Sequence, residues 1–180
     1  TSEIVIDVYT DASDRKDASQ GGYIILINGY YVKSKSYRLS HFTASSYAAE
    51  LLALRVGVVQ GLCLIPCLRS FGYKKIRIDA HCDNLPVVQR VHEIAPGDGS
   101  YKLVFSNCLA ALRWYKKHSK VNFYHISGEV NPADIFTKPM DFWKLSRLLN
   151  TTVLKKTFHL QSMPSNKESS TISSAIIKIN

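Results

Sequence analysis

The stretch IVIDVYTDAS, residues 4–13, is the part of the sequence from which the fold can be built outward. Its β-branched and aromatic residues predict a strand, and the polar residues 14–20 that follow predict where the strand stops. Asp11 therefore lies at a strand end. A carboxylate there becomes useful if other carboxylates converge on it to hold a hard cation. The candidates are Glu50, Asp83 and Asp134, and we predict that the four acids form one metal site.

The composition predicts a single domain. The chain has 180 residues, of which 46% are hydrophobic, and this is enough for one ordinary core. No apolar run approaches the length of a bilayer span, and the N-terminus lacks a secretory pattern, so we expect no membrane partner. The chain begins with Thr1 rather than Met, which leaves two interpretations open, a trimmed chain and a piece released from a polyprotein.

The charge favours a polyanionic partner. Lys and Arg outnumber Asp and Glu by 23 to 14, giving a net charge of +9. Such a balance is typical of proteins that bind nucleic acid. A basic surface that only aids solubility fits the charge equally well, so the positions of the cations must decide.

The four cysteines are interpreted as reduced core thiols. Cys63, Cys67, Cys82 and Cys108 lie in apolar stretches and lack paired close spacing. Cys63 and Cys67 are four residues apart on a predicted helix, which is compatible with a metal pair. No cluster of His or Cys accompanies them, so the core is the favoured place for all four.

Three antiparallel strands are predicted in the first third. The strand at residues 4–10 is followed by one at 23–27, and Asn28-Gly29 is a strong hairpin signal that returns the chain as a strand at 30–39. Alternation along this last strand predicts one basic and aromatic face, made of Tyr31, Lys33, Lys35 and Tyr37. Lys33 and Lys35 are candidate phosphate contacts, although exposed lysines also protect edge strands from aggregation.

A helix is predicted at residues 47–63, ended by Pro66. Ser45 or Ser46 can cap it, and the amides around them can also receive a phosphate. Glu50 falls in its first turn, where the helix dipole favours a carboxylate whatever its function. Position alone therefore does not make Glu50 a metal ligand.

Residues 74–84 are predicted to form another strand, which ends near an acid, Asp83. This acid precedes a short helix that runs to Val91, so an N-cap is its plain alternative role. The strand is expected to lie parallel to the first one through a right-handed crossover.

A helix is predicted at residues 101–118, with Val104, Cys108, Ala111 and Tyr115 inward. Arg113, Lys116 and Lys117 crowd its C-terminal end. Cations there stabilise the helix dipole, and beside Trp114 they also suit a phosphate backbone.

The last predicted elements are a strand at 121–126 and a helix at 140–149 with Phe142, Leu145 and Leu149 inward. Residues 151–180 are polar and serine-rich, which predicts a flexible tail in which residues 176–179 can pair as a short strand. The domain is therefore expected to span residues 1–150.

The segment NPADIFTKPM, residues 131–140, resembles the end of the ribonuclease H domain in the polymerase polyprotein of copia-type LTR retrotransposons. The motifs YTDAS (9–13), SSYAAEL (45–51) and CDN (82–84) also match the pattern of this family, in the same order. Each short motif is weak by itself, but four in order across residues 3–150 are specific. The resemblance implies an α/β ribonuclease H-like fold, a mixed five-stranded sheet with its first three strands antiparallel and helices packed on it.

The same resemblance implies an endonuclease that hydrolyses the RNA strand of RNA:DNA hybrids. Asp11, Glu50, Asp83 and Asp134 would be the acidic quartet that binds two Mg²⁺ ions, which Mn²⁺ can replace. By analogy, Asp11 would bridge both ions, Glu50 and Asp83 would bind one, and Asp134 the other. The expected partners are the hybrid and the reverse transcriptase domain of the same polyprotein, in the cytoplasm within virus-like particles, with access to the nucleus.

The chain departs from the pattern of many cellular ribonucleases H at one place. The loop at residues 127–130 lacks the histidine that they carry, and we expect the nearby His125 to pack within its strand. Two other functions stay open. One is a module that has lost turnover and binds nucleic acid or tethers a polymerase, and the other is an integrase or resolvase of the same superfold.

Overall fold

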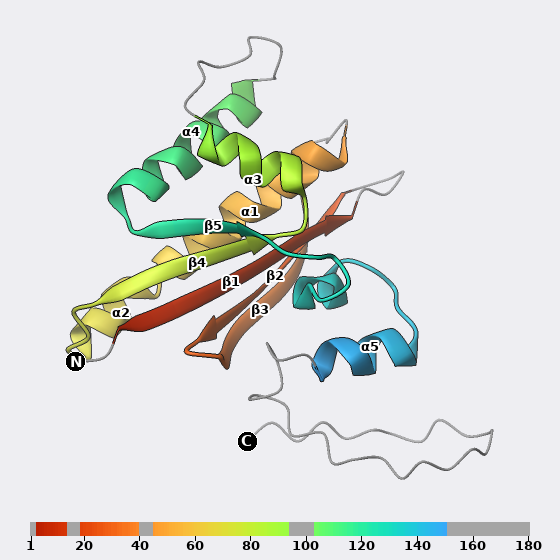
Figure 1. Cartoon of the computed structure of the whole chain (residues 1–180), viewed down its shortest axis with the longest axis horizontal. Helices are drawn as coiled ribbons and strands as arrows, with labels where there is room; N and C mark the ends of the chain where they lie inside the picture. The colour runs from red at the N-terminus through yellow and green to blue at the C-terminus, as the bar shows by residue number, and fades with distance from the viewer. Residues whose placement is uncertain (1–2, 14–18, 40–44, 94–102, 151–180) are drawn as a thin grey trace.

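The structure of the protein is a computed structural model that describes residues 3–13, 19–39, 45–93 and 103–150. Figure 1 shows a sheet with helices packed against it. The elements are β1 (Ile4–Ser13), β2 (Gln20–Ile27), β3 (Tyr30–Arg38), α1 (Ser46–Leu62), α2 (Ile65–Ser70), β4 (Ile76–Cys82), α3 (Leu85–His92), α4 (Leu103–His118), β5 (Val121–His125), the 3-10 helix η1 (Pro132–Phe136) and α5 (Phe142–Leu149). The expected tail lies outside the described residues.

The sheet has the predicted topology. Its strand order is β3-β2-β1-β4-β5. The pairs β1–β2 and β2–β3 are antiparallel, whereas β1–β4 and β4–β5 are parallel. The hairpin between β2 and β3 turns at Asn28 and Gly29, whose φ angles of 51° and 85° are both positive, as a tight two-residue turn requires. The predicted fold class is confirmed.

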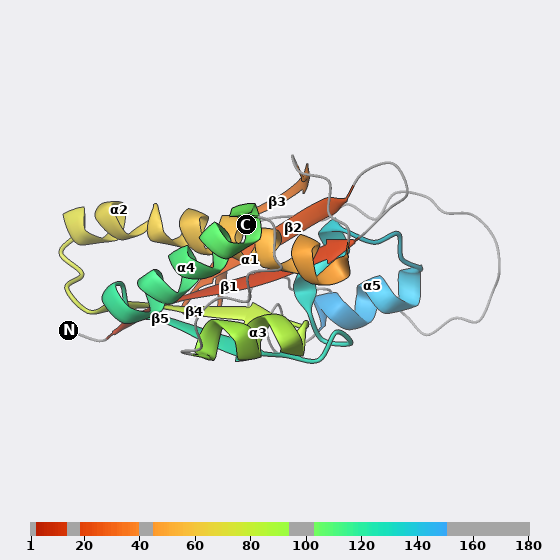
Figure 2. The same cartoon turned by 90° about the horizontal axis from the view of Figure 1, so that it is seen from above.

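The main core lies between the sheet and the helices α1, α3 and α4. Alternate residues of β1, such as Ile6 and Val8, are fully buried in it. Helix α1 comes close to the sheet because Gly57 has no side chain, and a Cβ there would lie 2.5 Å from Thr10 Cγ2. Figure 2 shows α2 and α5 at opposite ends of the molecule, with α5 beyond the end of β1.

A smaller core lies on the other face of the sheet, under η1. Tyr9, Ile24, Leu26 and Ala133 form its buried centre. Gly22 of β2 lets η1 approach, since a Cβ at this position would lie 2.7 Å from Phe136 Cβ. This contact determines where η1, which carries Asp134, sits on the sheet.

The predicted basic and aromatic face of β3 wrongly included Tyr31. Ile25 pairs with Lys33 and Leu26 with Tyr31, so Val32 is an extra residue in a β-bulge. A bulge reverses the alternation of side chains beyond it. Tyr31 therefore packs against the smaller core, while the two lysines and Tyr37 face the side of α1.

The helix predicted at 47–63 ends at Leu62, and Pro66 does not end it but lies in the first turn of α2. Proline is tolerated there because the first-turn amides lack intrahelical partners anyway. Residues Ser46–Ser70 are long and apolar enough to cross a membrane by length and composition, so the expectation that no run has this length was wrong. Leu51, Leu54 and Val58 of this segment are buried in the main core, and 39% of its apolar window is buried inside the structure.

Two predictions about inward-facing helix residues also need correction. Phe142 of α5 is 58% exposed, and Leu148 is buried in its place. Among the described side chains of α4, the buried ones are Phe105, Cys108 and Leu112. The other three predicted positions, Val104, Ala111 and Tyr115, are only half-buried. An α-helix of this length exposes most of its circumference, so a small rotation changes which side chains are covered.

The cysteines are all free thiols, as expected, but only two belong to the core. Cys82 and Cys108 are buried, whereas Cys63 and Cys67 are exposed. Cys63 is the C-cap of α1, and Cys67 lies in α2, a helix without buried residues.

Candidate active site

Parallel pairing of β1 with β4 brings two of the acids together. Thr10 pairs with Cys82, so the residues that follow them, Asp11 and Asp83, come next to each other at the carboxyl ends of the strands. This edge is where α/β sheets bind their ligands. Asp11 is completely buried, and Asp83 is partly exposed.

The other two acids arrive from a helix and a 3-10 helix. Glu50 lies just beyond the first turn of α1, not within it as predicted, because the helix already begins at Ser46. It accepts a hydrogen bond of 3.2 Å from the backbone N–H of Ala12. Asp134 lies in η1 and is 2% exposed. The side chain of Asn131 ties η1 to β1, since its Nδ2 donates to the carbonyl of Thr10 at 3.0 Å.

The four carboxylates form two overlapping clusters. Oxygens of Asp11, Asp83 and Asp134 lie within 4.8 Å of one another, and so do ligand atoms of Glu50, Cys82 and Asp83. The clusters share Asp83, whereas the analogy gave the shared role to Asp11. The buried thiol of Cys82 lies 3.8 Å from Glu50 Oε2, and burial raises the pKa of this thiol.

The environment of this acid cluster opposes full ionisation. Burial, reinforced by the charges of Asp11 and Asp83, raises the pKa of Glu50 to about 9. Burial also raises the pKa of Asp11 to about 6, although the hydrogen bond from Thr137 and the charge of Lys138 counteract it. The pKa of Asp83 is raised by burial as well. Such a group of desolvated carboxylates is stabilised by a bound cation.

Two lysines that were not predicted as site residues supply positive charge to the acid cluster. Lys138 Nζ lies 3.1 Å from Asp11 Oδ1 and 2.8 Å from Asp134 Oδ1. Lys144 Nζ lies 3.0 Å from the other oxygen of Asp134. Burial alone would lower the pKa of Lys138, but its hydrogen bond to Asp134 and the charge of Asp11 outweigh this effect and raise it. Two signals in the sequence pointed to Lys138: its four-residue spacing from Asp134 and its place in the motif at residues 131–140.

Neutral groups also orient the acids. The hydroxyl of Thr137 donates to Asp11 Oδ2, and the side chain of Asn131 hydrogen-bonds Asp83. Gly128 leaves space for Asp83, because a Cβ at this glycine would lie 3.0 Å from Asp83 Oδ2.

Two expectations around Asp83 were wrong. The N-cap of α3 is Asn84, whose Oδ1 accepts from Val87 N–H, so the Asp83 carboxylate does not cap the helix. His125 does not pack into its strand; it is exposed, and its Nε2 lies 3.2 Å from the carbonyl oxygen of Asp83. A five-residue strand at the sheet edge leaves this last side chain uncovered.

The predicted phosphate contacts lie in three separate places. Ser45 and Ser46 are exposed at the start of α1, and Ser45 Oγ caps the helix by accepting from Ala48 N–H. Lys33 and Lys35 line a groove between β3 and α1. The third place is α4, where Arg113 and Lys116 contact residues of α3.

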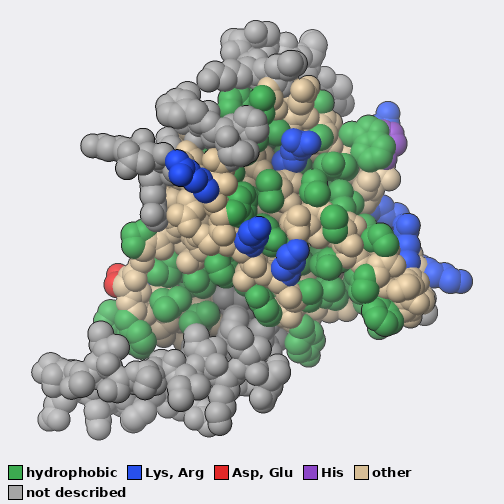
Figure 3. All heavy atoms as spheres, turned by 180° about the vertical axis from the view of Figure 1, so that it is seen from behind, with side chains coloured by type: hydrophobic (Ala, Val, Ile, Leu, Met, Phe, Trp, Pro, Cys, Tyr) green, Lys and Arg blue, Asp and Glu red, His purple; other side chains and the backbone are tan. Residues whose placement is uncertain are grey.

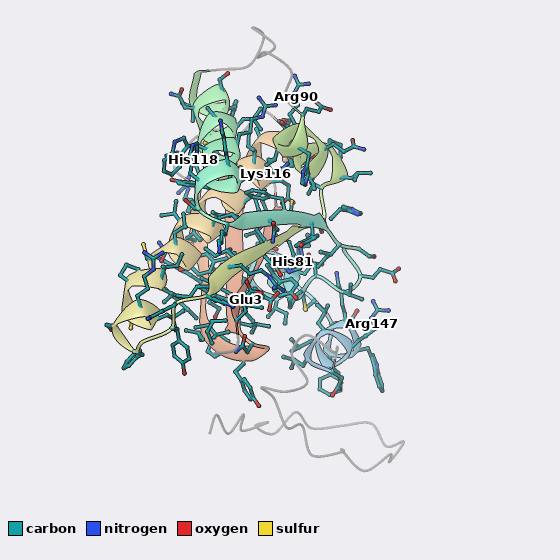
Figure 4. All side chains as sticks on the ribbon, turned by 60° about the vertical axis from the view of Figure 1, so that its left-hand side comes forward. Glu3, His81, Arg90, Lys116, His118 and Arg147 are labelled. Carbon is teal, nitrogen blue, oxygen red and sulfur yellow. The ribbon has the colours of Figure 1, made fainter. Side chains whose placement is uncertain are left out.

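The α4 cations differ in how freely they can reach a ligand. Arg113 Nη2 donates to the carbonyl of Arg90 at 2.8 Å, which fastens α4 to α3. Lys116 Nζ contacts His92 Nδ1 at 2.7 Å, and Lys117 is exposed. Figure 4 shows Arg90 and Lys116 at one end of the molecule and Arg147 of α5 at the other.

No protein-family model matches the chain, and no curated protein matches its sequence. Among solved structures it is similar to LC11-RNase H1, isolated from compost, with 19% identity over 76% of this chain and 93% of that chain and a TM-score of 0.50. It is also similar to the N-terminal ribonuclease H domain of Rv2228c from Mycobacterium tuberculosis, with 14% identity over 73% and 95% of the two chains and a TM-score of 0.56. A complex of LC11-RNase H1 with an RNA/DNA hybrid matches with 18% identity over 74% and 93% and a TM-score of 0.50. The chain has the ribonuclease H-like fold.

Proposed function

We propose that the chain is a metal-dependent ribonuclease H that hydrolyses the RNA strand of RNA:DNA hybrids. The observation that carries this proposal is the convergence of four carboxylates, from β1, α1, the end of β4 and η1, into two clusters that share Asp83. The similar solved structures support it, since they are ribonucleases H and one of them holds a hybrid.

The donor set fits Mg²⁺, with Mn²⁺ as a substitute. Hard divalent ions prefer oxygen ligands, and Asp11, Glu50, Asp83 and Asp134 offer only oxygens. Cys82 is a poor ligand for such an ion, and its thiol already faces Glu50. Two bound ions would supply activation of a water molecule and stabilisation of the leaving oxygen.

The protein groups around the acids would position them for this task. Thr137 and Asn131 hold Asp11 and Asp83 in place by hydrogen bonds. Lys138 bridges Asp11 and Asp134 and keeps them close despite their like charge. An incoming cation must displace this ammonium group from the same oxygens.

Hybrid recognition would depend on phosphate contacts and groove shape, with 2′-hydroxyls identifying the RNA strand. The proposed contacts are Ser45 and Ser46 beside Glu50, and Arg113, Lys116 and Lys117 along α4. Lys33 and Lys35 would reach the nucleic acid from β3. Affinity should fall steeply with added salt.

We further propose that the domain comprises residues 1–150 and acts within a copia-type retroelement. Its RNA:DNA hybrid would then arise by reverse transcription, and the reverse transcriptase domain of the same polyprotein would be its partner. The site of action would be cytoplasmic virus-like particles, with access to the nucleus. The motifs at residues 9–13, 45–51, 82–84 and 131–140 support this context.

A module without turnover is the second candidate. It is favoured by the two ammonium groups of Lys138 and Lys144, which neutralise Asp11 and Asp134 without any metal. In that case the chain would bind a hybrid or tether a polymerase but would not cut.

The test uses the purified chain with labelled RNA:DNA hybrid, duplex DNA and duplex RNA, with and without Mg²⁺. Metal-dependent cutting confined to the RNA of the hybrid is expected. Binding without cutting identifies the second candidate, and cutting of duplex DNA indicates an integrase or resolvase. Asp11→Asn removes one charge that the ions need, so wild-type cutting by this variant would refute the metal site.

A further inference from the structure

A basic groove lies on the helix-covered face of the sheet, between β3 and α1. We infer that the groove between β3 and α1 binds a single-stranded segment of nucleic acid that continues from the hybrid. The inference shares the nucleic-acid substrate of the proposed function but does not require hydrolysis. The groove has a volume of about 660 Å³, and its lining comes from β3, Leu39 and α1, with Tyr23 of β2 beneath.

The charged residues described in the lining of the β3–α1 groove are all positive. Lys33, Lys35 and Arg38 line it from β3, and Arg55 lines it from α1. None of the described lining residues is acidic. Seen from behind (Figure 3), Lys and Arg side chains lie among hydrophobic ones, and acidic side chains appear only at the margin of this face. Four cations around one hollow create a potential that attracts a polyanion.

The groove also offers aromatic rings. The half-buried ring of Tyr37 is the one a base could reach, and it lies 6.1 Å from the ring of Tyr23, which is 1% exposed and supports Tyr37 from below. The hydroxyl of Tyr37 is buried and forms no hydrogen bond with any described residue. Bases stack on aromatic side chains while cations hold the backbone, which is how single strands are bound without sequence preference.

One end of the groove lies beside the acid cluster. Tyr37 pairs with Gly21, which in turn pairs with Ala12, and the backbone N–H of Ala12 donates to Glu50. Burial, with the charges of Tyr23 and Glu50, raises the pKa of Tyr37, so these groups are within electrostatic reach of each other. The Tyr37 end of the groove is therefore the end nearer to Glu50.

The dimensions select a single strand over a duplex. The groove follows β3 from Lys33 to Arg38, five steps of about 3.3 Å each, or roughly 17 Å. A volume of about 660 Å³ holds a few nucleotides, whereas a complete double helix cannot enter it. The groove is also too basic to favour an uncharged ligand.

The experiment measures binding of a fluorescent oligothymidine of about 10 nucleotides by anisotropy, in EDTA. Lys33→Glu with Lys35→Glu is compared with Lys74→Glu with Lys75→Glu, which changes the net charge equally. Both control lysines are exposed and precede β4, at the end of the sheet opposite the acids. The groove pair should weaken binding at least about tenfold and lower the salt slope by about 1.4, while the control pair should change the affinity less than about threefold.

A variant that changes no charge distinguishes binding in the groove from a general effect of net charge. Val59→Trp places a bulky side chain into the groove without changing any charge, and it should also weaken binding about tenfold. Wild-type affinity in Val59→Trp, or equal losses in both lysine pairs, would overturn the inference. If the Glu variants fail to fold by circular dichroism, Lys33→Gln with Lys35→Gln takes their place and must lower the salt slope too.

The proposed function and the groove inference can be refuted independently of each other. A chain that binds the oligonucleotide through the groove but never cuts a hybrid refutes the proposed function alone. A chain that cuts hybrids but binds the oligonucleotide equally well after Val59→Trp refutes the groove alone. Displacement of the oligonucleotide by polyglutamate at equal charge would assign the groove to an acidic peptide and overturn the nucleic-acid inference.

Discussion

Replacing Glu50 with Gln should stabilise the metal-free protein and do so increasingly as the pH rises. Glu50 is 5% exposed, and burial raises its pKa from 4.5 to about 9. Between these two values the folded protein holds this proton while the unfolded chain has lost it. Stability therefore falls as the pH rises, and Gln, which cannot ionise, removes this loss.

The size of this stabilisation follows from the pKa shift of Glu50. Each pH unit above 4.5 costs the wild type about 1.4 kcal/mol, so the advantage of Glu50→Gln should reach about 4 kcal/mol near pH 7.5 and disappear near pH 4. Gln keeps an oxygen that can accept from the N–H of Ala12, so the local hydrogen bond can persist. The same substitution should abolish stabilisation by Mg²⁺, because it removes a charged ligand.

Urea unfolding in EDTA at several pH values, followed by circular dichroism, measures this difference. Glu129→Gln is the matched control, since this carboxylate is exposed to water and its replacement should leave stability nearly unchanged at every pH. A gain for Glu50→Gln that is the same at pH 4 and pH 7.5, or a loss at the higher pH, would contradict the reasoning.

The remaining predictions concern other parts of the site. Lys138→Met should lower the Mn²⁺ concentration for half-saturation several-fold, measured by electron paramagnetic resonance, because the ammonium no longer holds the carboxylates. Lys138→Arg should behave like the wild type, and unchanged Mn²⁺ binding in the Met variant would exclude competition. Gly22→Val should cost about 1–3 kcal/mol in urea unfolding and weaken Mn²⁺ binding, since its side chain would displace η1; full stability would show that η1 does not need this contact. Lys116→Ala with Lys117→Ala should lower the salt slope of hybrid binding by about 1.8, and an unchanged slope would remove both from the interface.

The sequence by itself was sufficient for the sheet and for the choice of acids. Runs of β-branched residues and the Asn28-Gly29 turn are local signals, and they predicted the antiparallel β1, β2 and β3. Asp11 and Asp83 follow apolar runs, and the carboxyl ends of parallel strands meet at one edge. The pattern of the sequence therefore predicted that these two acids meet at one edge of the sheet.

Only the tertiary structure decided the electrostatics and the exposure of the site. Lys138 and Asp11 are 127 residues apart, and their ion pair depends on the packing of η1 over Gly22. The β-bulge at Val32, opposite Ile25 and Leu26, moved Tyr31 to the other face of β3, which no alternation rule could foresee. The pKa of Glu50 likewise depends on burial by segments distant in the chain. Local patterns encode the elements, whereas desolvation and charge pairing arise only when those elements pack together.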